Sequence, residues 1–126
     1  MATVVLDTSV LIALFKEDDR HHKSAVQATS AKNVYLISSI TLSEALVAAF
    51  RLNQHAGNQH NLHIQKSMDQ IVPIDDAIAL RAAEIRAEKN LSLPDAIISA
   101  TAYISKAQLW SCDKALVKSH LGAVQI

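Results

Sequence analysis

The chain has 126 residues, half of them hydrophobic, which suits one domain with a single core. Its formal net charge is +0, so the whole-molecule field does not favour nucleic acid and any such binding would need local basic groups. The single cysteine, Cys112, excludes an internal disulfide, and no run approaches the roughly 18 apolar residues of a membrane span. We expect a cytoplasmic protein without a signal peptide, since Asp7 interrupts the first apolar segment.

Short apolar segments rich in β-forming residues alternate with segments of helical periodicity. Strands are predicted at residues 3–6, 34–37, 71–74, 108–111 and 123–126. Helices are predicted at residues 19–31, 41–52, 59–70, 75–89 and 94–106, with a further helix after Asp7 and a short one at 114–118. Uninterrupted apolar strands are typical of a parallel sheet covered on both faces. We therefore expect one domain, residues 1–126, with a three-layer α/β/α architecture.

Two helices and one connection have distinctive patterns. The helix at 75–89 places Ile78, Ala82 and Ile85 on one face, which predicts an amphipathic surface helix. The helix at 94–106 is almost entirely apolar or small and is expected to be the buried one. Residues 53–58 are polar and contain a glycine, which predicts a short connection rather than a domain boundary.

Four acidic residues occupy corresponding places in successive strand–helix units. Asp7 and Asp113 directly follow predicted strands, Glu44 lies one turn into the helix after the second strand, and Asp95 begins the buried helix. The carboxyl ends of parallel strands meet at one edge of the sheet, where ligands bind. We therefore expect these four acids, called the acidic rim below, to face one site.

Each acid also has a purely structural interpretation. Asp7 and Asp113 could be helix N-caps, and Glu44 and Asp95 each stand three residues after a hydroxyl residue, Thr41 and Ser92, as in a capping box. Capping does not require the acids to share one edge, however. Their common location therefore favours a site.

Four converging carboxylates would repel one another unless a cation neutralised them. An all-oxygen set of ligands suits the hard ions Mg²⁺ and Mn²⁺. Such ions lower the pKa of a bound water and stabilise charge on a leaving oxygen, which is the chemistry of phosphodiester hydrolysis. The rim thus predicts a divalent-metal phosphodiesterase site.

The segments around these acids resemble a known family. They are residues 4–12 (VVLDTSVLI), 43–44 (SE), 93–102 (LPDAIISATA) and 111–113 (SCD), of which the first and third are the specific ones. In order, spacing and length the chain is similar to PIN-domain ribonucleases, and especially to the single-domain VapC toxins of toxin–antitoxin pairs. The resemblance covers essentially the whole chain.

This resemblance implies a parallel sheet flanked by helices and an endoribonuclease that depends on Mg²⁺ or Mn²⁺. It also implies a homodimer and a small antitoxin protein that holds the enzyme inactive. By position, Asp7 and Asp95 match the family's acids that hold metal most directly. Glu44 matches the second acid of the family's set of four, and Asp113 matches the fourth. Three hydroxyl residues match supporting positions, in which they bond carboxylates or metal-bound water: Thr8, Ser9 and Ser111.

Several alternatives stay open. Phosphatases with an aspartyl nucleophile usually carry a second acid two residues after the first, where this chain has Ser9. A glycine-rich phosphate-binding loop is excluded because the whole chain has only two glycines. His60 and His63 have the spacing of a helical zinc pair, although exposed helix faces explain them better. Arg86 could meet RNA phosphate or the acidic end of an antitoxin, or it could simply lie on a solvated helix face. The non-enzymatic alternative is an inactive PIN-like module that binds RNA or a protein.

Overall fold

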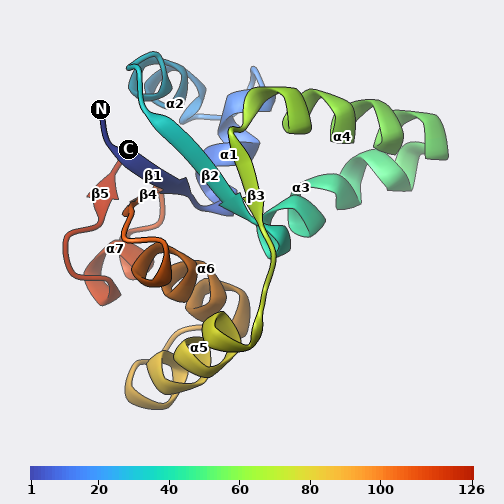
Figure 1. Ribbon diagram of the computed structural model, residues 1–126. Coiled ribbons are helices and arrows are strands. Elements are labelled where there is room, and N and C mark those ends of the chain that lie inside the picture. The colour runs from blue at the N-terminus through green and yellow to red at the C-terminus, as the bar shows by residue number, and fades with distance from the viewer.

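The computed structural model describes all residues from Met1 to Ile126 and has the predicted α/β architecture. Five parallel strands form one sheet in the order β3-β2-β1-β4-β5. The strands are β1 (Thr3–Leu6), β2 (Val34–Ser38), β3 (Gln70–Val72), β4 (Gln108–Ser111) and β5 (Val124–Gln125). Helices cover both faces of the sheet, α1 to α4 on one side and α5 to α7 on the other (Figure 1).

The strand predictions agree with the structure except at two ends. The third strand was expected to reach residue 74 but ends at Val72, because the next residue, Pro73, has no N–H to donate to a neighbouring strand. The last strand was expected at residues 123–126 but is limited to β5 (Val124–Gln125), which lies at the edge of the sheet and pairs only with β4. The three central strands, which position the acidic rim, match their prediction to within one residue.

Seven helices connect and cover these strands. They are α1 (Thr8–Phe15), α2 (His22–Thr29), α3 (Ser39–Leu52), α4 (Gln54–Ser67), α5 (Asp76–Glu88), α6 (Leu93–Ile104) and α7 (Lys114–Ser119). As predicted, α5 buries Ile78, Ala82 and Ile85, and α6 has the most buried residues of any helix. The second helix is shorter than expected because the residues before it form a turn, in which Asp19 accepts a hydrogen bond from the backbone N–H of His21.

The predicted connection at residues 53–58 is wrong. Only Asn53 separates α3 from α4, and its side chain caps α4 by accepting from Ala56 N at 2.7 Å. Gly57 is buried inside α4, where an added Cβ would lie 2.1 Å from Phe50 Cδ1. A glycine that looks like a loop residue therefore allows α3 and α4 to pack closely. The pair projects from the body of the molecule (Figure 1).

The core has two parts, one on each face of the sheet. Alternate strand residues point to opposite faces, so Val5 and Leu109 pack with α5, α6 and α7 while Val4 and Trp110 pack with α1 and α2. Burial on both faces explains why the strands are uninterrupted apolar runs. None of the seven helices combines the length and the hydropathy that a membrane span requires. At the carboxyl edge of the sheet, Asp7 and Asp113 lie between a strand and the next helix, whereas Glu44 and Asp95 lie on α3 and α6.

Candidate active site

Asp7 is the buried centre of the rim, with only 3% of its surface exposed. It follows β1 and caps α1, since its Oδ1 accepts from the backbone N–H of Val10 at 3.0 Å. The Ser9 hydroxyl donates to the same oxygen at 2.6 Å, and the Ser111 hydroxyl donates to Oδ2. The predicted capping role is thus real, but two further donors converge on this carboxylate.

The same two hydroxyls tie Asp7 to the loop after β4. Ser9 Oγ accepts from the backbone N–H of Cys112 at 3.0 Å, and Ser111 Oγ accepts from that of Asp113 at 2.9 Å. Each hydroxyl therefore links a backbone donor of the β4–α7 loop to one carboxylate oxygen. These contacts hold the loop that carries the fourth acid against the first acid.

Burial raises the pKa of Asp7 above the usual range of an aspartate. The hydrogen bonds from Ser111, Ser9 and Val10 lower it in part, and the negative charge of Asp113 raises it further. The carboxylate is thus held in place by donors but lacks a nearby positive charge.

Glu44 is exposed on α3, and its Oε1 accepts a hydrogen bond of 2.6 Å from the Thr8 hydroxyl. The predicted capping box with Thr41 is wrong, because α3 begins two residues earlier and Ser38 caps it by accepting from Ile40 N. Glu44 therefore has no role at the helix start. It is instead oriented by the residue that follows Asp7.

Thr41 is a site residue that the sequence analysis considered only as a cap. It is fully buried, and its hydroxyl lies 3.2 Å from that of Thr8, so the two threonines connect α1 with α3 beneath Glu44. The contact spans 33 residues of sequence. Local patterns carry no signal for such a distant partner.

Asp95 is half-buried in the first turn of α6. Ser92 caps this helix as predicted, since its hydroxyl accepts from the backbone N–H of Asp95 at 3.3 Å. Burial raises the pKa of Asp95; the Ser92 hydroxyl lowers it, and the charges of Asp113, Asp7 and Glu44 each raise it further. All four acids of the rim therefore contribute to one local field.

Asp113 is exposed and caps α7, since its Oδ1 accepts from Ala115 N at 2.9 Å. Its predicted role as a cap is confirmed. As with Asp7, the cap does not exclude a second role, because Oδ2 of the same carboxylate is not the capping atom.

The donor set of the rim suits a hard divalent cation, because it consists of carboxylate and hydroxyl oxygens. Each carboxylate oxygen can accept two hydrogen bonds; Oδ1 of Asp7 accepts two and Oδ2 accepts one, which leaves an acceptor position on Oδ2. No group of three or more His, Cys, Asp or Glu side chains is arranged so that it could hold a metal ion. The acids share an edge and a field, but their close convergence stays a prediction.

The other residues noted in the sequence have structural partners. The Arg86 Nε donates to the Leu91 carbonyl at 3.4 Å, beside a shallow hollow also lined by Lys89. His60 packs edge-on against Phe15, with ring centroids 5.3 Å apart. His60 therefore has a packing partner within the fold.

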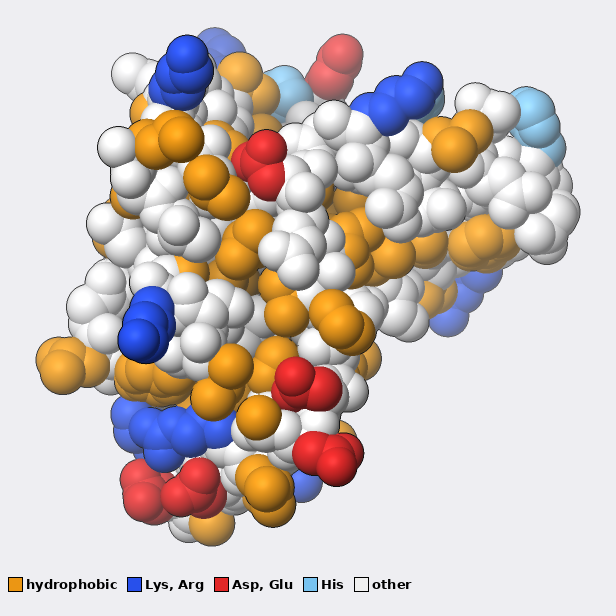
Figure 2. Space-filling model, viewed as in Figure 1, with side chains coloured by type: hydrophobic (Ala, Val, Ile, Leu, Met, Phe, Trp, Pro, Cys, Tyr) orange, Lys and Arg blue, Asp and Glu red, His pale blue; other side chains and the backbone are white.

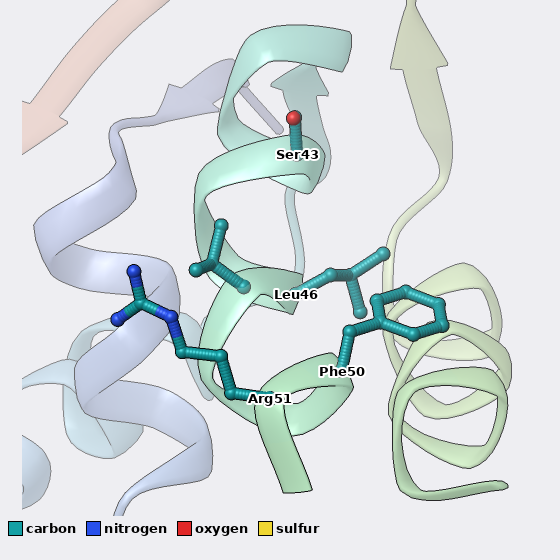
Figure 3. Close-up of a pocket in the computed structure, with 5 residues that line it drawn as sticks. Ser43, Leu46, Phe50 and Arg51 are labelled. Carbon is teal, nitrogen blue, oxygen red and sulfur yellow. The ribbon is translucent and has the colours of Figure 1, made fainter. Parts of the chain in front are cut away.

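Two apolar grooves flank α3 close to Glu44. One, of about 430 Å³, is lined by residues of α1, α3 and α4, including Phe15, Lys16 and Glu44. The other, of about 470 Å³, is lined by Ser43, Leu46, Val47, Phe50 and Arg51. Figure 3 shows Phe50 directed toward α4 and Arg51 toward α1. Hydrophobic side chains gather along the same projecting pair of helices in Figure 2.

The fold and the rim define a class of protein: a small α/β domain whose parallel sheet presents carboxylates at the ends of its strands. The profile of the PIN domain matches residues 4–119. The chain belongs to the PIN domain family, which confirms the resemblance seen in its sequence. No curated protein matches the sequence.

Solved structures agree with this assignment. A chain of a toxin–antitoxin complex from Klebsiella pneumoniae is 31% identical, with a TM-score of 0.80 over 96% of this chain and 95% of that one. The fold also matches VapC20 from Mycobacterium tuberculosis, a toxin that cleaves the sarcin–ricin loop, with 21% identity and a TM-score of 0.76 over 92% and 94% of the two chains. FitAcB from Neisseria gonorrhoeae has the same identity and TM-score, over 98% and 96%.

Proposed function

We propose that this chain is a metal-dependent endoribonuclease, a hydrolase of RNA phosphodiester bonds, and the toxin of a toxin–antitoxin pair. The observation that carries the proposal is the position of Asp95, half-buried at the start of α6 in the field of the three other rim acids. A fold has little reason to gather four acids at one edge for stability, because their mutual repulsion opposes folding. Membership of the PIN domain family supports the same conclusion.

The four acids would hold Mg²⁺ or Mn²⁺, with Asp7 and Asp95 as the most direct ligands. When bound, the metal would supply a lowered pKa for the attacking water and stabilisation of charge at the leaving oxygen. Asp7 is the fixed ligand, because three donors hold it and Oδ2 keeps one acceptor position. Glu44 and Asp113 are exposed and each has one carboxylate oxygen held, by Thr8 and by Ala115 N, so small adjustments about these contacts would complete the set.

Thr8, Ser9 and Ser111 act behind the acids as orienting hydroxyls. Ser9 and Ser111 fix the direction of the Asp7 carboxylate, and Thr8 fixes that of Glu44. Thr41 joins this group through Thr8. None of the four carries a charge, so their contribution is geometric.

An antitoxin is the expected protein partner, since the 31% identical structure is a toxin–antitoxin complex. The apolar grooves beside α3 support this, because exposed side chains such as Phe50 and Leu52 would be buried by a partner. A homodimer is also proposed, with exposed Leu80 and Leu93 on α5 and α6 as a surface for pairing. Residues 1–126 would form one domain in this assembly, and the cytoplasmic location stays a prediction.

The test is cleavage of a mixed pool of RNA by the purified protein. Wild-type protein with Mn²⁺ is expected to cut RNA, and both excess chelator and the variant Asp95→Asn are expected to abolish cutting. The matched control is Asp76→Asn, an exposed acid in the first turn of α5 outside the rim, which should cut normally. Cutting that survives Asp95→Asn would refute the assignment.

The inactive binding module is the second candidate and predicts a different result. Such a module would bind RNA or its partner equally well with and without metal, and would not cut. Absence of cleavage together with undiminished RNA binding by Asp95→Asn would favour it.

A further inference from the structure

The fourth acid of the rim depends on a short helix. Asp113 is fastened to the first turn of α7 through the backbone N–H of Ala115, so its carboxylate follows that helix. Helix α7 has six residues, too few to be stable alone, and Leu116 is its one buried residue. The orientation of α7, and with it the position of Asp113, must therefore come from contacts with other elements.

His120 provides such a contact at the carboxyl end of α7. Its backbone N–H donates to the Leu116 carbonyl at 3.1 Å, and its side chain is 4% exposed. Its ring Nδ1 lies 2.6 Å from Ser99 Oγ, and the ring stacks on Tyr103 with centroids 4.2 Å apart and planes at 22°. Both partners belong to α6.

The partners of His120 lie on the helix that carries the rim acid Asp95. Asp95, Ser99 and Tyr103 are spaced four residues apart, so they follow one another along one face of α6. The α6 residues that hold the end of α7 therefore continue the same face that presents Asp95. Asp95 and the two residues that contact His120 thus belong to one face of the same helix.

Arg81 of α5 and Lys89, the residue that follows α5, complete this cluster. Lys89 Nζ donates to the Ser119 carbonyl, and the Arg81 guanidinium lies 5.1 Å from the centre of the Tyr103 ring. Burial, with a further effect from Lys89, lowers the pKa of His120 to about 4. A neutral ring, which keeps one acceptor nitrogen, fits a hydrogen bond with a serine hydroxyl.

We propose that His120 is a positioning residue of the active site, which holds α7 against Ser99 and Tyr103 and so sets where Asp113 lies relative to Asp95. This rests on the proposed function, in which both acids serve one metal site. His120 touches neither acid and acts only through α7. Its removal should therefore lower turnover without weakening RNA binding.

The test combines hydrogen exchange with kinetics on the full chain. The variants are His120→Ala and His120→Asn, the second of which keeps a polar atom close to the place of Nδ1. The control is His55→Ala, an exposed histidine on α4. The two readouts are the exchange rate of the α7 amides at Val117 and His120, and kcat and KM for RNA cleavage with Mn²⁺.

His120→Ala is expected to speed exchange of the α7 amides by about tenfold, the effect of losing one hydrogen bond, and to lower kcat similarly with little change in KM. His120→Asn should recover part of both, and His55→Ala should match wild type. Unchanged α7 exchange in His120→Ala, or faster exchange with unchanged kcat, would overturn the proposal. Should His120→Ala fail to fold, Ser99→Ala removes the same hydrogen bond and is judged identically.

Failure of the proposed function would be visible separately. A wild-type protein that does not cut RNA refutes the nuclease assignment and, with it, the catalytic purpose given to His120. The exchange data would still test whether His120 holds α7 in place. Faster exchange of the α7 amides only in the His120 variants would support that role, and equal exchange in all variants would overturn it.

Discussion

Removal of the Ser111 hydroxyl probes the link between Asp7 and the loop after β4. Ser111 is fully buried at the end of β4; its hydroxyl donates to Asp7 Oδ2 and accepts from the backbone N–H of Asp113. Ser111→Ala removes one oxygen and adds no bulk, so the change in stability reports the lost hydrogen bonds rather than a steric effect.

The expected cost follows from these two bonds. A hydrogen bond to a charged group is worth about 1.5 to 3 kcal/mol, and one between neutral groups about 1 kcal/mol. Because Asp113 is exposed, water can replace the second bond, so the first should dominate. We therefore expect the free energy of unfolding to fall by about 2 kcal/mol.

The same substitution should change the pH dependence of cleavage. Of the three hydrogen bonds that lower the pKa of Asp7, the one from the Ser111 hydroxyl has the largest effect, so its loss should raise that pKa further. A raised pKa means that the carboxylate is protonated at a higher pH, and activity should fall off earlier as the pH is lowered. The acid side of the pH–rate profile should therefore move upward in Ser111→Ala.

Urea denaturation followed by circular dichroism, together with cleavage rates between pH 5 and 8, would measure both effects. Ser105→Ala is a matched control, since Ser105 is half-buried at the opposite end of α6 from Asp95. Equal stability and identical pH profiles in wild type and Ser111→Ala would refute the reasoning.

Three further predictions concern other positions. Asp7→Asn keeps an oxygen that can accept from the Val10 N–H but removes a buried charge. It should abolish cleavage, and urea denaturation without metal should show a stability equal to or greater than that of wild type. An unfolded variant would contradict this. Gly57→Ala should cost about 1 to 3 kcal/mol despite the better helix propensity of alanine, because the methyl would meet the ring of Phe50; a melting temperature at or above that of wild type would show that Phe50 moves aside freely. His120 should make stability fall as the pH drops from 6.5 toward about 4, because the unfolded chain then binds a proton that the native ring does not, by at most about 3 kcal/mol. Urea midpoints at pH 7 and 4.5 should separate less in His120→Asn, and equal separations would disprove the effect.

The sheet and the positions of Asp7 and Asp113 beside it could be predicted because they leave local signals. A parallel sheet buried on both faces requires continuous apolar strands, and its carboxyl edge follows directly from where those strands end. Asp7 and Asp113 were therefore placed correctly at the ends of β1 and β4. The amphipathic pattern of α5 was equally local.

Features that depend on distant partners could not be predicted. Asn53 and Gly57 have the composition of a loop, and only the packing of Phe50 on α4 makes the glycine part of a helix. The contact of Thr41 with Thr8 joins residues 33 positions apart, and the contact of Ser99 with His120 joins residues 21 apart. No short motif encodes such pairs, so these supporting residues emerge only from the fold.

The central claim is that the four rim acids act together as one metal site, and titration calorimetry with Mn²⁺ tests it most directly. Wild-type protein is expected to bind Mn²⁺, and Asp7→Asn and Asp95→Asn are each expected to lose most of that binding, whereas the exposed control Asp76→Asn should bind as wild type does. Equal binding by wild type and both rim variants, or no binding by wild type, would show that the acids do not converge on a metal and would contradict the account.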